Sequence, residues 1–301
     1  MFTRMLIPLD GSKTAEKVLP YARHLAGKFK VPVELLGVID IAEMATHIAA
    51  DKARFLDTLV EDGVRASTTY LRGVASTFAG VNVTCTVEKD RAEDAIIKKG
   101  EADTGMLIAM ATHGRSGLNR FLLGSVAEKV LRGTANPLLL VRATEEAKAE
   151  GDAAITSIIV PLDGSELAES VIPMVVGVAK NLNLEVVLFR AYHMPYNVYG
   201  GEDGAYAVSY DALIAGVRDE TNDYLDRKVA EVKKLGFSKV SRLSKEGFPS
   251  DEIIALGCST PANLIAMCSH GRSGMRRFVL GSVTENVVRH SGGAVLVVRA
   301  K

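Results

Sequence analysis

The sequence predicts an α/β protein made of two tandem doubly wound domains. Two glycine-rich segments, 113–132 and 270–289, share 14 of 20 residues when compared position by position. Each follows a short apolar run, and such runs alternate with amphipathic segments along the chain, as in parallel α/β sheets. A chain of 301 residues, 48% of them apolar, can also form two cores of ordinary size. The duplication therefore indicates two similar domains.

Five short β-branched or leucine-rich runs per copy predict buried parallel strands, joined by right-handed crossovers with helices on both faces of the sheet. In the first copy these strands are Leu6–Leu9, Val33–Ile39, Val81–Val87, Met106–Ala111 and Leu138–Val141. In the second they are Ile158–Leu162, Glu185–Ala191, Lys239–Leu243, Asn263–Cys268 and Ala294–Val298. Apolar residues three and four apart predict intervening helices, such as Thr14–Lys28, Arg54–Thr77 and Ala92–Lys99.

The boundary between the copies falls in a charged, alanine-rich segment, Thr144–Ser157. Its lack of bulky apolar residues is typical of a linker. Directly after it, "SIIVPLDGSELAESVIP" echoes "RMLIPLDGSKTAEKVLP" near the start of the chain. We therefore place the domains at residues 1–146 and 154–301.

Composition narrows the class of partner. Thirty-six basic and 36 acidic residues leave no net charge, which argues against nonspecific binding to nucleic acid or anionic membrane. Cys85, Cys258 and Cys268 lack the spacing of a disulfide framework or a zinc site. The chain start is too short for a signal-peptide core, and no apolar run approaches the ~20 residues of a membrane span. We expect an unexported, soluble protein of the reducing cytoplasm with a small-molecule ligand.

The first strand of each copy ends in "PLDGS". Open doubly wound sheets bind ligands beyond the carboxyl ends of their strands, so Asp10 and Asp163 are candidate ligand-binding acids. Ser12 and Ser165 are placed to cap the next helix. An Asp-Gly-Ser turn followed by a helix cap would explain the same residues without a ligand.

The fourth strand of each copy ends in "ATHG" or "CSHG", and a glycine-rich loop runs from there to a new helix. Such glycines let backbone amides approach an anion, and a helix N-terminus favours phosphate. Glu128 and Glu285, three residues after the serines, predict S-x-x-E capping boxes. An ordinary glycine-rich connector is the alternative. The loop residues are Gly114, Gly117, Gly124 and Ser125, with copies Gly271, Gly274, Gly281 and Ser282.

Known catalytic motifs fit this loop poorly. It lacks the lysine of GxxxxGK[ST], and Leu118 replaces the last glycine of a G-x-S-x-G elbow. Asp10, His113 and Ser125 supply the residue types of a Ser-His-Asp triad, but a serine engaged in a capping box is a disfavoured nucleophile. His113 and His270 have no companion ligands at metal-binding spacing. We expect a binding protein with no catalytic residues and no protein-built metal site.

Both copies resemble the universal stress protein (UspA-like) domain, and the chain resembles a tandem member of that family. The family's nucleotide-binding branch carries G-x2-G-x9-G-[S/T] after the fourth strand. Nine residues likewise separate Gly114 from Gly124, and nine separate the copies of these glycines. Ala111 and Cys268 replace the opening glycine, and the cysteine would crowd the ribose. The resemblance implies a five-stranded sheet of order 3-2-1-4-5, of the adenine nucleotide alpha hydrolase-like type.

The implied ligand is ATP or a related adenine nucleotide, with Mg²⁺ carried by the phosphates. By the resemblance, Asp10 and Asp163 hold the adenosine, and the backbone of Val38 and Ala191 meets adenine. Arg115 is either a phosphate partner or a solvated side chain, as is its copy. The implied site comprises Pro8, Leu9, Asp10, Val38, Ala111, His113, Gly114, Arg115, Gly117, Gly124, Ser125 and Val126, and in the second copy Pro161, Leu162, Asp163, Ala191, Cys268, His270, Gly271, Arg272, Gly274, Gly281, Ser282 and Val283.

The second copy carries four extra residues, which lie in the tyrosine-rich stretch Ala191–Asp211. Five of the eight tyrosines are there, so the stretch is a candidate flap over the second site or a partner-binding surface. Folding of its rings onto their own domain is the alternative.

The resemblance also predicts how the copies meet. Single-domain relatives dimerise through the fifth strand, and Asn136–Ala143 and Gly293–Ala300 are apolar edge strands. We expect them to pair within the chain as a pseudo-twofold unit, with a further homodimer left open.

Three functions remain open on the sequence. The first is a stress-response protein that binds ATP and acts as a nucleotide-dependent regulator. The second is a nucleotide-free interaction protein that docks partners through loop 192–210. The third is a slow ATPase that uses His113 or His270.

Overall fold

The computed structural model describes residues 2–46, 55–113, 123–142, 151–194, 210–269 and 280–299. The strands of the first half are β1 (Met5–Pro8), β2 (Val33–Ile39), β3 (Val83–Lys89), β4 (Leu107–Ala111) and β5 (Leu138–Val141). Its helices are η1 (Ala15–Val18), α1 (Leu19–Phe29), α2 (Ile41–Thr46), α3 (Leu56–Ala75), α4 (Ala92–Ala102) and α5 (Ser125–Gly133).

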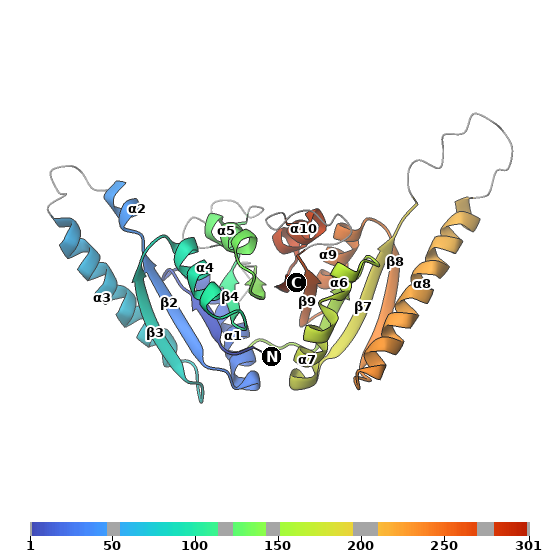
Figure 1. The fold of residues 1–301 in the computed structure, drawn as a ribbon, viewed down its shortest axis with the longest axis horizontal. Helices are drawn as coiled ribbons and strands as arrows, with labels where there is room; N and C mark the ends of the chain where they lie inside the picture. The colour runs from blue at the N-terminus through green and yellow to red at the C-terminus, as the bar shows by residue number, and fades with distance from the viewer. Residues whose placement is uncertain are drawn as a thin grey trace.

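The second half repeats this order (Figure 1). Its strands are β6 (Ser157–Pro161), β7 (Glu185–Tyr192), β8 (Val240–Glu246), β9 (Asn263–Cys268) and β10 (Ala294–Val298). Its helices are α6 (Glu166–Glu169), α7 (Ile172–Leu182), α8 (Tyr210–Lys234), α9 (Pro249–Ser259) and α10 (Ser282–His290).

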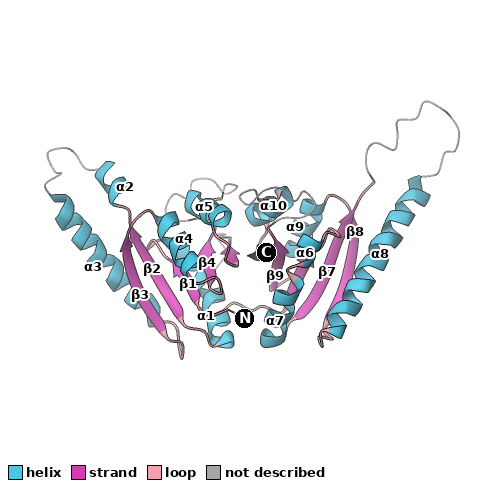
Figure 2. Cartoon of the chain, viewed as in Figure 1, coloured by secondary structure: helices cyan, strands magenta, loops and turns pink. Residues whose placement is uncertain are grey.

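Within the described residues the strands form one 10-stranded sheet in the order β3-β2-β1-β4-β5-β10-β9-β6-β7-β8. Each half has the predicted order 3-2-1-4-5, so the doubly wound architecture is confirmed. Helices cover both faces of the sheet (Figure 2). Strands β2, β5, β9 and β10 have the predicted bounds. The edge strand β3 is displaced by two residues toward the C-terminus, and β8 begins one residue later and ends three residues later than predicted. Both follow the register of their neighbours β2 and β7, which pair with them as far as Lys89 and Glu246.

The halves meet where β5 pairs antiparallel with β10, with Leu138 opposite Val297 and Val141 opposite Ala294. The predicted pairing of the fifth strands within the chain is therefore confirmed. It covers two apolar edges that would otherwise template aggregation. The arginine after each of these strands reaches the other half: Arg142 Nη1 donates to the carbonyl of His290 at 3.1 Å. Arg299 Nη2 donates to that of Leu131 at 3.0 Å.

Alternate residues of each central strand enter cores on opposite faces of the sheet. Met5 and Ile7 belong to the core under α1 and α3, while Leu6 and Ile108 belong to the core under α4 and α5. Burial on both faces is why the sequence shows continuous apolar runs instead of alternation.

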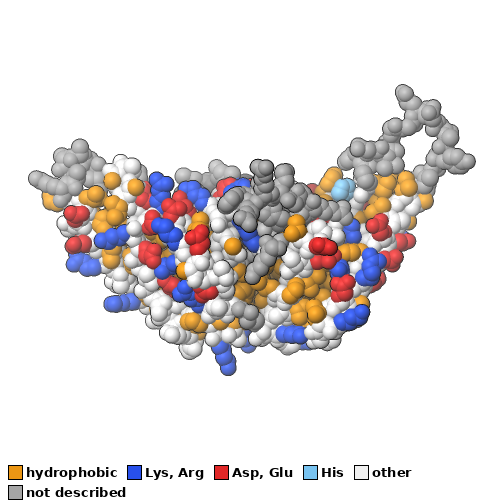
Figure 3. Space-filling model, in the orientation of Figure 1, with side chains coloured by type: hydrophobic (Ala, Val, Ile, Leu, Met, Phe, Trp, Pro, Cys, Tyr) orange, Lys and Arg blue, Asp and Glu red, His pale blue; other side chains and the backbone are white. Residues whose placement is uncertain are grey.

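The visible face mixes basic and acidic side chains without a large zone of either sign (Figure 3), in keeping with equal numbers of each. Among the described helices, none combines the length and apolarity needed to cross a membrane.

Candidate functional site

Each half places an acid in a tight turn at the tip of its first strand. Asp10 Oδ1 accepts hydrogen bonds from the backbone N–H of Ser12 at 2.9 Å and from its hydroxyl at 2.6 Å. Asp163 Oδ1 accepts the same pair from Ser165, at 2.9 and 2.6 Å. The duplicated sequence therefore produces the same carboxylate geometry twice.

Glycine is required inside these turns. Gly11 has φ 80° and Gly164 has φ 87°, values that a side chain makes costly. Ser12 Oγ accepts from the backbone N–H three residues on at 3.1 Å, and Ser165 Oγ does so at 3.2 Å. Ser165 is the N-cap of α6, as predicted. In the first half the N-cap of η1 is Thr14, and Ser12 contacts the first helical N–H from two residues further back.

The predicted capping boxes at α5 and α10 are wrong. Gly124 is the N-cap of α5, with extended backbone, and Ser125 is already the first helical residue. Gly281 and Ser282 repeat this arrangement. Because glycine lacks a hydroxyl, no side-chain cap bond is recorded at either helix in the described part of the chain.

The glutamates of these presumed boxes turn toward the following helical turn. Glu128 Oε1 accepts from Arg132 at 3.1 and 3.2 Å, and Glu285 Oε1 accepts from Arg289 at 2.6 and 3.2 Å. The first N–H groups of both helices consequently lack side-chain caps in the described residues, which suits binding of an anion. The argument that capping disfavours Ser125 as a nucleophile is also removed.

His113 does not join a catalytic triad in the described structure. Its Nδ1 lies 3.0 Å from Thr112 Oγ1, and its buried Nε2 has no hydrogen-bond partner among the described residues. Burial, and then the charge of Arg142, lowers the pKa of His113. Both effects favour the neutral ring, and among the described residues it is bonded neither to Asp10 nor to Ser125.

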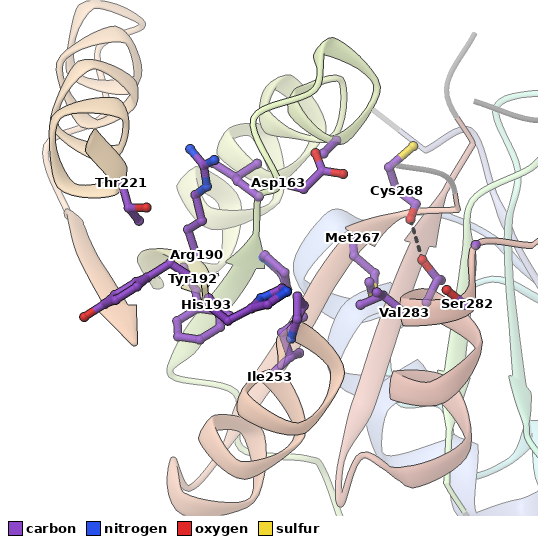
Figure 4. Close-up of a pocket in the computed structure, with 18 of the residues that line it drawn as sticks. Asp163, Arg190, Tyr192, His193, Thr221, Ile253, Met267, Cys268, Ser282 and Val283 are labelled. Carbon is purple, nitrogen blue, oxygen red and sulfur yellow. Dashed lines mark hydrogen bonds between the residues drawn. The ribbon is translucent and has the colours of Figure 1, made fainter. Parts of the chain in front are cut away.

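A pocket of about 410 Å³ lies at the carboxyl ends of β6, β7 and β9 (Figure 4). This volume is in the range of small-ligand sites. Every described residue of the second-copy site lines it: Pro161, Leu162, Asp163, Ala191, Cys268, Gly281, Ser282 and Val283. His270, Gly271, Arg272 and Gly274 lie outside the described residues. The fold thus brings together the strand-end acid and the start of α10, which are far apart in sequence.

Cys268 is buried in the wall of this pocket. Its Sγ accepts a hydrogen bond from Ser170 Oγ at 3.8 Å, so the thiol faces the end of α6. The pocket volume of about 410 Å³ is the space that remains beside the cysteine side chain.

The sequence did not predict the remaining walls. Arg190, Tyr192 and His193 come from the end of β7, and Thr221 from α8. Ile253 of α9 lies on the opposite side of the cavity from Thr221 (Figure 4). The β7 residues flank the predicted Ala191 and were within reach of sequence reasoning. Thr221 was not, because its place depends on how α8 packs against the sheet.

In the first half the corresponding residues gather at the same edge of the sheet. Pro8 ends β1 and is followed directly by Leu9 and Asp10, while Val38 lies in β2 and Ala111 ends β4. Gly114, Arg115 and Gly117 lie outside the described residues, whereas Val126 lies in α5.

The glycine before each of these helices is tied to the preceding strand. Gly124 N–H donates to the carbonyl of Thr112 at 2.8 Å, and Gly281 N–H donates to that of Ser269 at 2.9 Å. A Cβ on Gly124 would lie 2.9 Å from that carbonyl oxygen, so this position excludes a side chain. The two loops therefore end in the same conformation.

Two other expected features concern the tyrosine loop and metals. Most of the loop, 195–209, lies outside the described residues; beside it, Tyr210 donates to Glu246 Oε1 at 2.9 Å. Among the described residues, no three or more His, Cys, Asp or Glu side chains are grouped to hold a metal ion.

Comparison with known proteins decides the family. The model of the universal stress protein family matches residues 1–142 and 154–299. The chain belongs to the universal stress protein family. A universal stress protein of Mycolicibacterium smegmatis is 21% identical over 302 residues, covering 99% of this chain and 97% of that one. One from Methanocaldococcus jannaschii is 26% identical over 142 residues, 47% of this chain and 83% of its own.

Solved structures support the fold. The crystal structure of a universal stress protein from Archaeoglobus fulgidus superposes with a TM-score of 0.68 at 23% identity. The match covers 99% of this chain and 98% of that one. The tandem architecture therefore has a precedent over its full length.

Proposed function

We propose that this universal stress protein binds ATP, or a related adenine nucleotide, in its strand-end sites and acts as a nucleotide-dependent regulator in the cytoplasm. The proposal is carried by one observation: eight residues that the sequence analysis predicts to bind the nucleotide all line one pocket of about 410 Å³. Asp163 stands at one wall and the start of α10 at the other.

The wall chemistry fits the parts of the nucleotide. Ala191, Ile253 and Met267 offer an apolar surface for the base. Asp163 offers a carboxylate to sugar hydroxyls, as acids do in other doubly wound nucleotide sites. The first N–H groups of α10 and its dipole favour the phosphates. Mg²⁺ would arrive with the phosphates, since the described residues offer it no cage.

A regulatory role without ATP hydrolysis agrees with the hydrogen bonds that His113 makes and lacks among the described residues. Its neutral ring has no hydrogen bond to Ser125 or Asp10 in the described structure. We therefore assign the site no catalytic residue. Phosphate release from ATP that disappears in His113→Ala would contradict this assignment.

The test begins with denaturation of freshly purified protein and identification of any released nucleotide, followed by calorimetric titration with ATP. Gly281→Val should abolish binding in the second half, because the side chain would stand between the backbone and the phosphates. Gly73→Val is the matched control, since a Cβ on Gly73 meets nothing within 4 Å. No heat at millimolar ATP, or an unchanged isotherm in Gly281→Val, would contradict the proposal.

A further inference from the structure

Arg190 gives the second pocket a positive charge that the first half does not have at the equivalent position. In β1 and β2, Pro8 lies opposite Leu36, and in β6 and β7 Pro161 lies opposite Phe189. The next residue along the second strand is Gly37 in the first half and Arg190 in the second. Gly37 and Arg190 therefore occupy equivalent positions in the two halves.

The packing behind these residues differs accordingly. A Cβ on Gly37 would lie 2.3 Å from Ser67 Oγ, so α3 sits directly against β2 at this point. Arg190 instead lies with its guanidinium carbon 4.8 Å from the ring centre of Tyr224 in α8, a cation–π distance. Tyr224 is buried, and its hydroxyl donates to Glu169 Oε1 at 2.8 Å. Arg190 is therefore held from behind by a packed aromatic ring.

Arg190 lies on the side of the pocket that belongs to the sugar. It lines the cavity together with Asp163, and Figure 4 shows the two on the same side, away from Ile253. The base side is the apolar wall of Ala191 and Ile253. The phosphates at the 5′ position are expected at α10, across the pocket. A cation at this place therefore faces neither the base nor the 5′ phosphates.

The lining of the pocket carries charged side chains of both signs. Among the described residues that line the pocket, Asp163 and Glu220 are the acidic ones. Arg190 is the one lining residue of this set that is a lysine or an arginine. In doubly wound folds that bind dinucleotides, an acid about 20 residues after the glycine-rich turn binds a free ribose hydroxyl, whereas an arginine nearby accommodates a phosphate on that oxygen. Arginine also presents paired donors that match phosphate oxygens.

We infer that the second pocket selects an adenine nucleotide that carries a phosphate monoester on its ribose, at the 2′ or the 3′ oxygen, and that Arg190 is the specificity-determining residue. The first site, with Gly37 in this position, takes the unmodified sugar. This inference rests on the proposed function and names the ligand class of its second site.

The experiment compares adenosine 3′,5′-bisphosphate and adenosine 2′,5′-bisphosphate with 5′-AMP in calorimetric titrations of the full chain. At least one bisphosphate should bind about 10- to 100-fold more tightly than 5′-AMP at one site, because a charge-assisted hydrogen-bonded pair is gained. Arg190→Gln should remove that preference, measured as the ratio of bisphosphate affinity to 5′-AMP affinity within the same variant. Arg190→Lys, which keeps the charge but loses the planar fork, should retain part of it.

Arg218→Gln is the matched control, because Arg218 is an exposed arginine of α8 paired with Asp219 and its loss changes net charge equally. The inference is overturned if ATP and 5′-AMP bind but neither bisphosphate binds more tightly, or if Arg190→Gln keeps the preference. GTP binding that exceeds ATP binding and depends on Arg190 would also overturn it, since Arg190 would then read the base. Failure of every nucleotide to bind would instead contradict the proposed function itself.

Discussion

The two halves share a backbone plan but differ in the side chains around their strand ends. Both hold an Asp-Gly-Ser turn and a glycine N-cap in the same geometry. At the start of the helix after the third strand, however, the first half has Arg91 and the second has Phe248, whose ring lies 5.3 Å from that of His193. Duplication has thus preserved the turn and N-cap geometry while the side chains around it have diverged.

The largest effect on stability is expected at Gly124, where the neighbouring backbone leaves no room for a side chain. Gly124→Ala places a methyl group 2.9 Å from the backbone oxygen of Thr112, so it should cost about 1–3 kcal/mol of unfolding free energy and weaken nucleotide binding in the first half. Urea denaturation measures the first effect and calorimetry the second.

The control for that substitution is Gly27→Ala, since a Cβ on Gly27, in α1, meets nothing within 4 Å. The same added methyl group should stabilise the protein by about 0.5–1 kcal/mol, because alanine is the better helix former. Equal effects of the two substitutions would show that the contact at Gly124 is not what restricts the residue.

A second prediction compares the acids under the two sites. Glu169 Oε1 accepts from the Tyr224 hydroxyl, and its Oε2 lies 2.9 Å from Nζ of Lys228, a side chain only 15% exposed. Glu169→Gln should therefore cost about 1–2 kcal/mol of unfolding free energy, because it leaves that ammonium less well paired.

The equivalent acid in the first half should matter less. Glu16 accepts from the Tyr70 hydroxyl at 3.2 Å and pairs with Lys13, whose side chain is 90% exposed. Glu16→Gln should cost about 0.5 kcal/mol or less, as solvent-exposed pairs usually do. Chemical denaturation of both variants checks the ranking, which fails if Glu16→Gln costs as much as its counterpart.

A smaller effect on stability is expected at Gly37, the first-half counterpart of Arg190. Gly37→Ala brings a methyl group to 2.3 Å from Ser67 Oγ, while Ser67 Cβ would remain 3.6 Å away. The single variant should cost about 1 kcal/mol of unfolding free energy, and adding Ser67→Ala should restore most of it. A double-mutant cycle measures this coupling; additive costs would contradict it.

The smallest effect concerns pH. Burial and the charge of Arg142 lower the pKa of His113 in the folded protein, so the unfolded chain takes up the proton first. The stability due to the neutral ring is complete above the unfolded pKa of about 6.5 and is lost as pH falls through the folded pKa.

His113→Gln should therefore lose less stability than the natural protein when urea unfolding is compared at pH 7.5 and pH 5.5. His24, whose pKa is lowered by burial and then by Lys28, contributes a slope of the same sign that both proteins share. Parallel slopes in the two proteins would show that His113 does not titrate as described.

The sequence was sufficient for the architecture because local and repeated signals agree. Apolar runs gave the strands, and β2, β5, β9 and β10 have the predicted bounds. The capping boxes were wrong because S-x-x-E describes spacing alone: the N-cap of each helix is the preceding glycine, and the serine is the first helical residue. Thr221 was missed because its place in the pocket depends on the packing of α8 against the sheet, which no local pattern encodes, whereas Arg190, next to the predicted Ala191, was within reach of the sequence.

The most direct test of nucleotide binding is a crystal structure of the full chain grown or soaked with millimolar ATP. We expect the adenosine against Ala191 and Asp163 in the second half, with the phosphates at the first N–H groups of α10. An empty cleft at saturating ATP, or a nucleotide bound elsewhere on the protein, would contradict the proposed function.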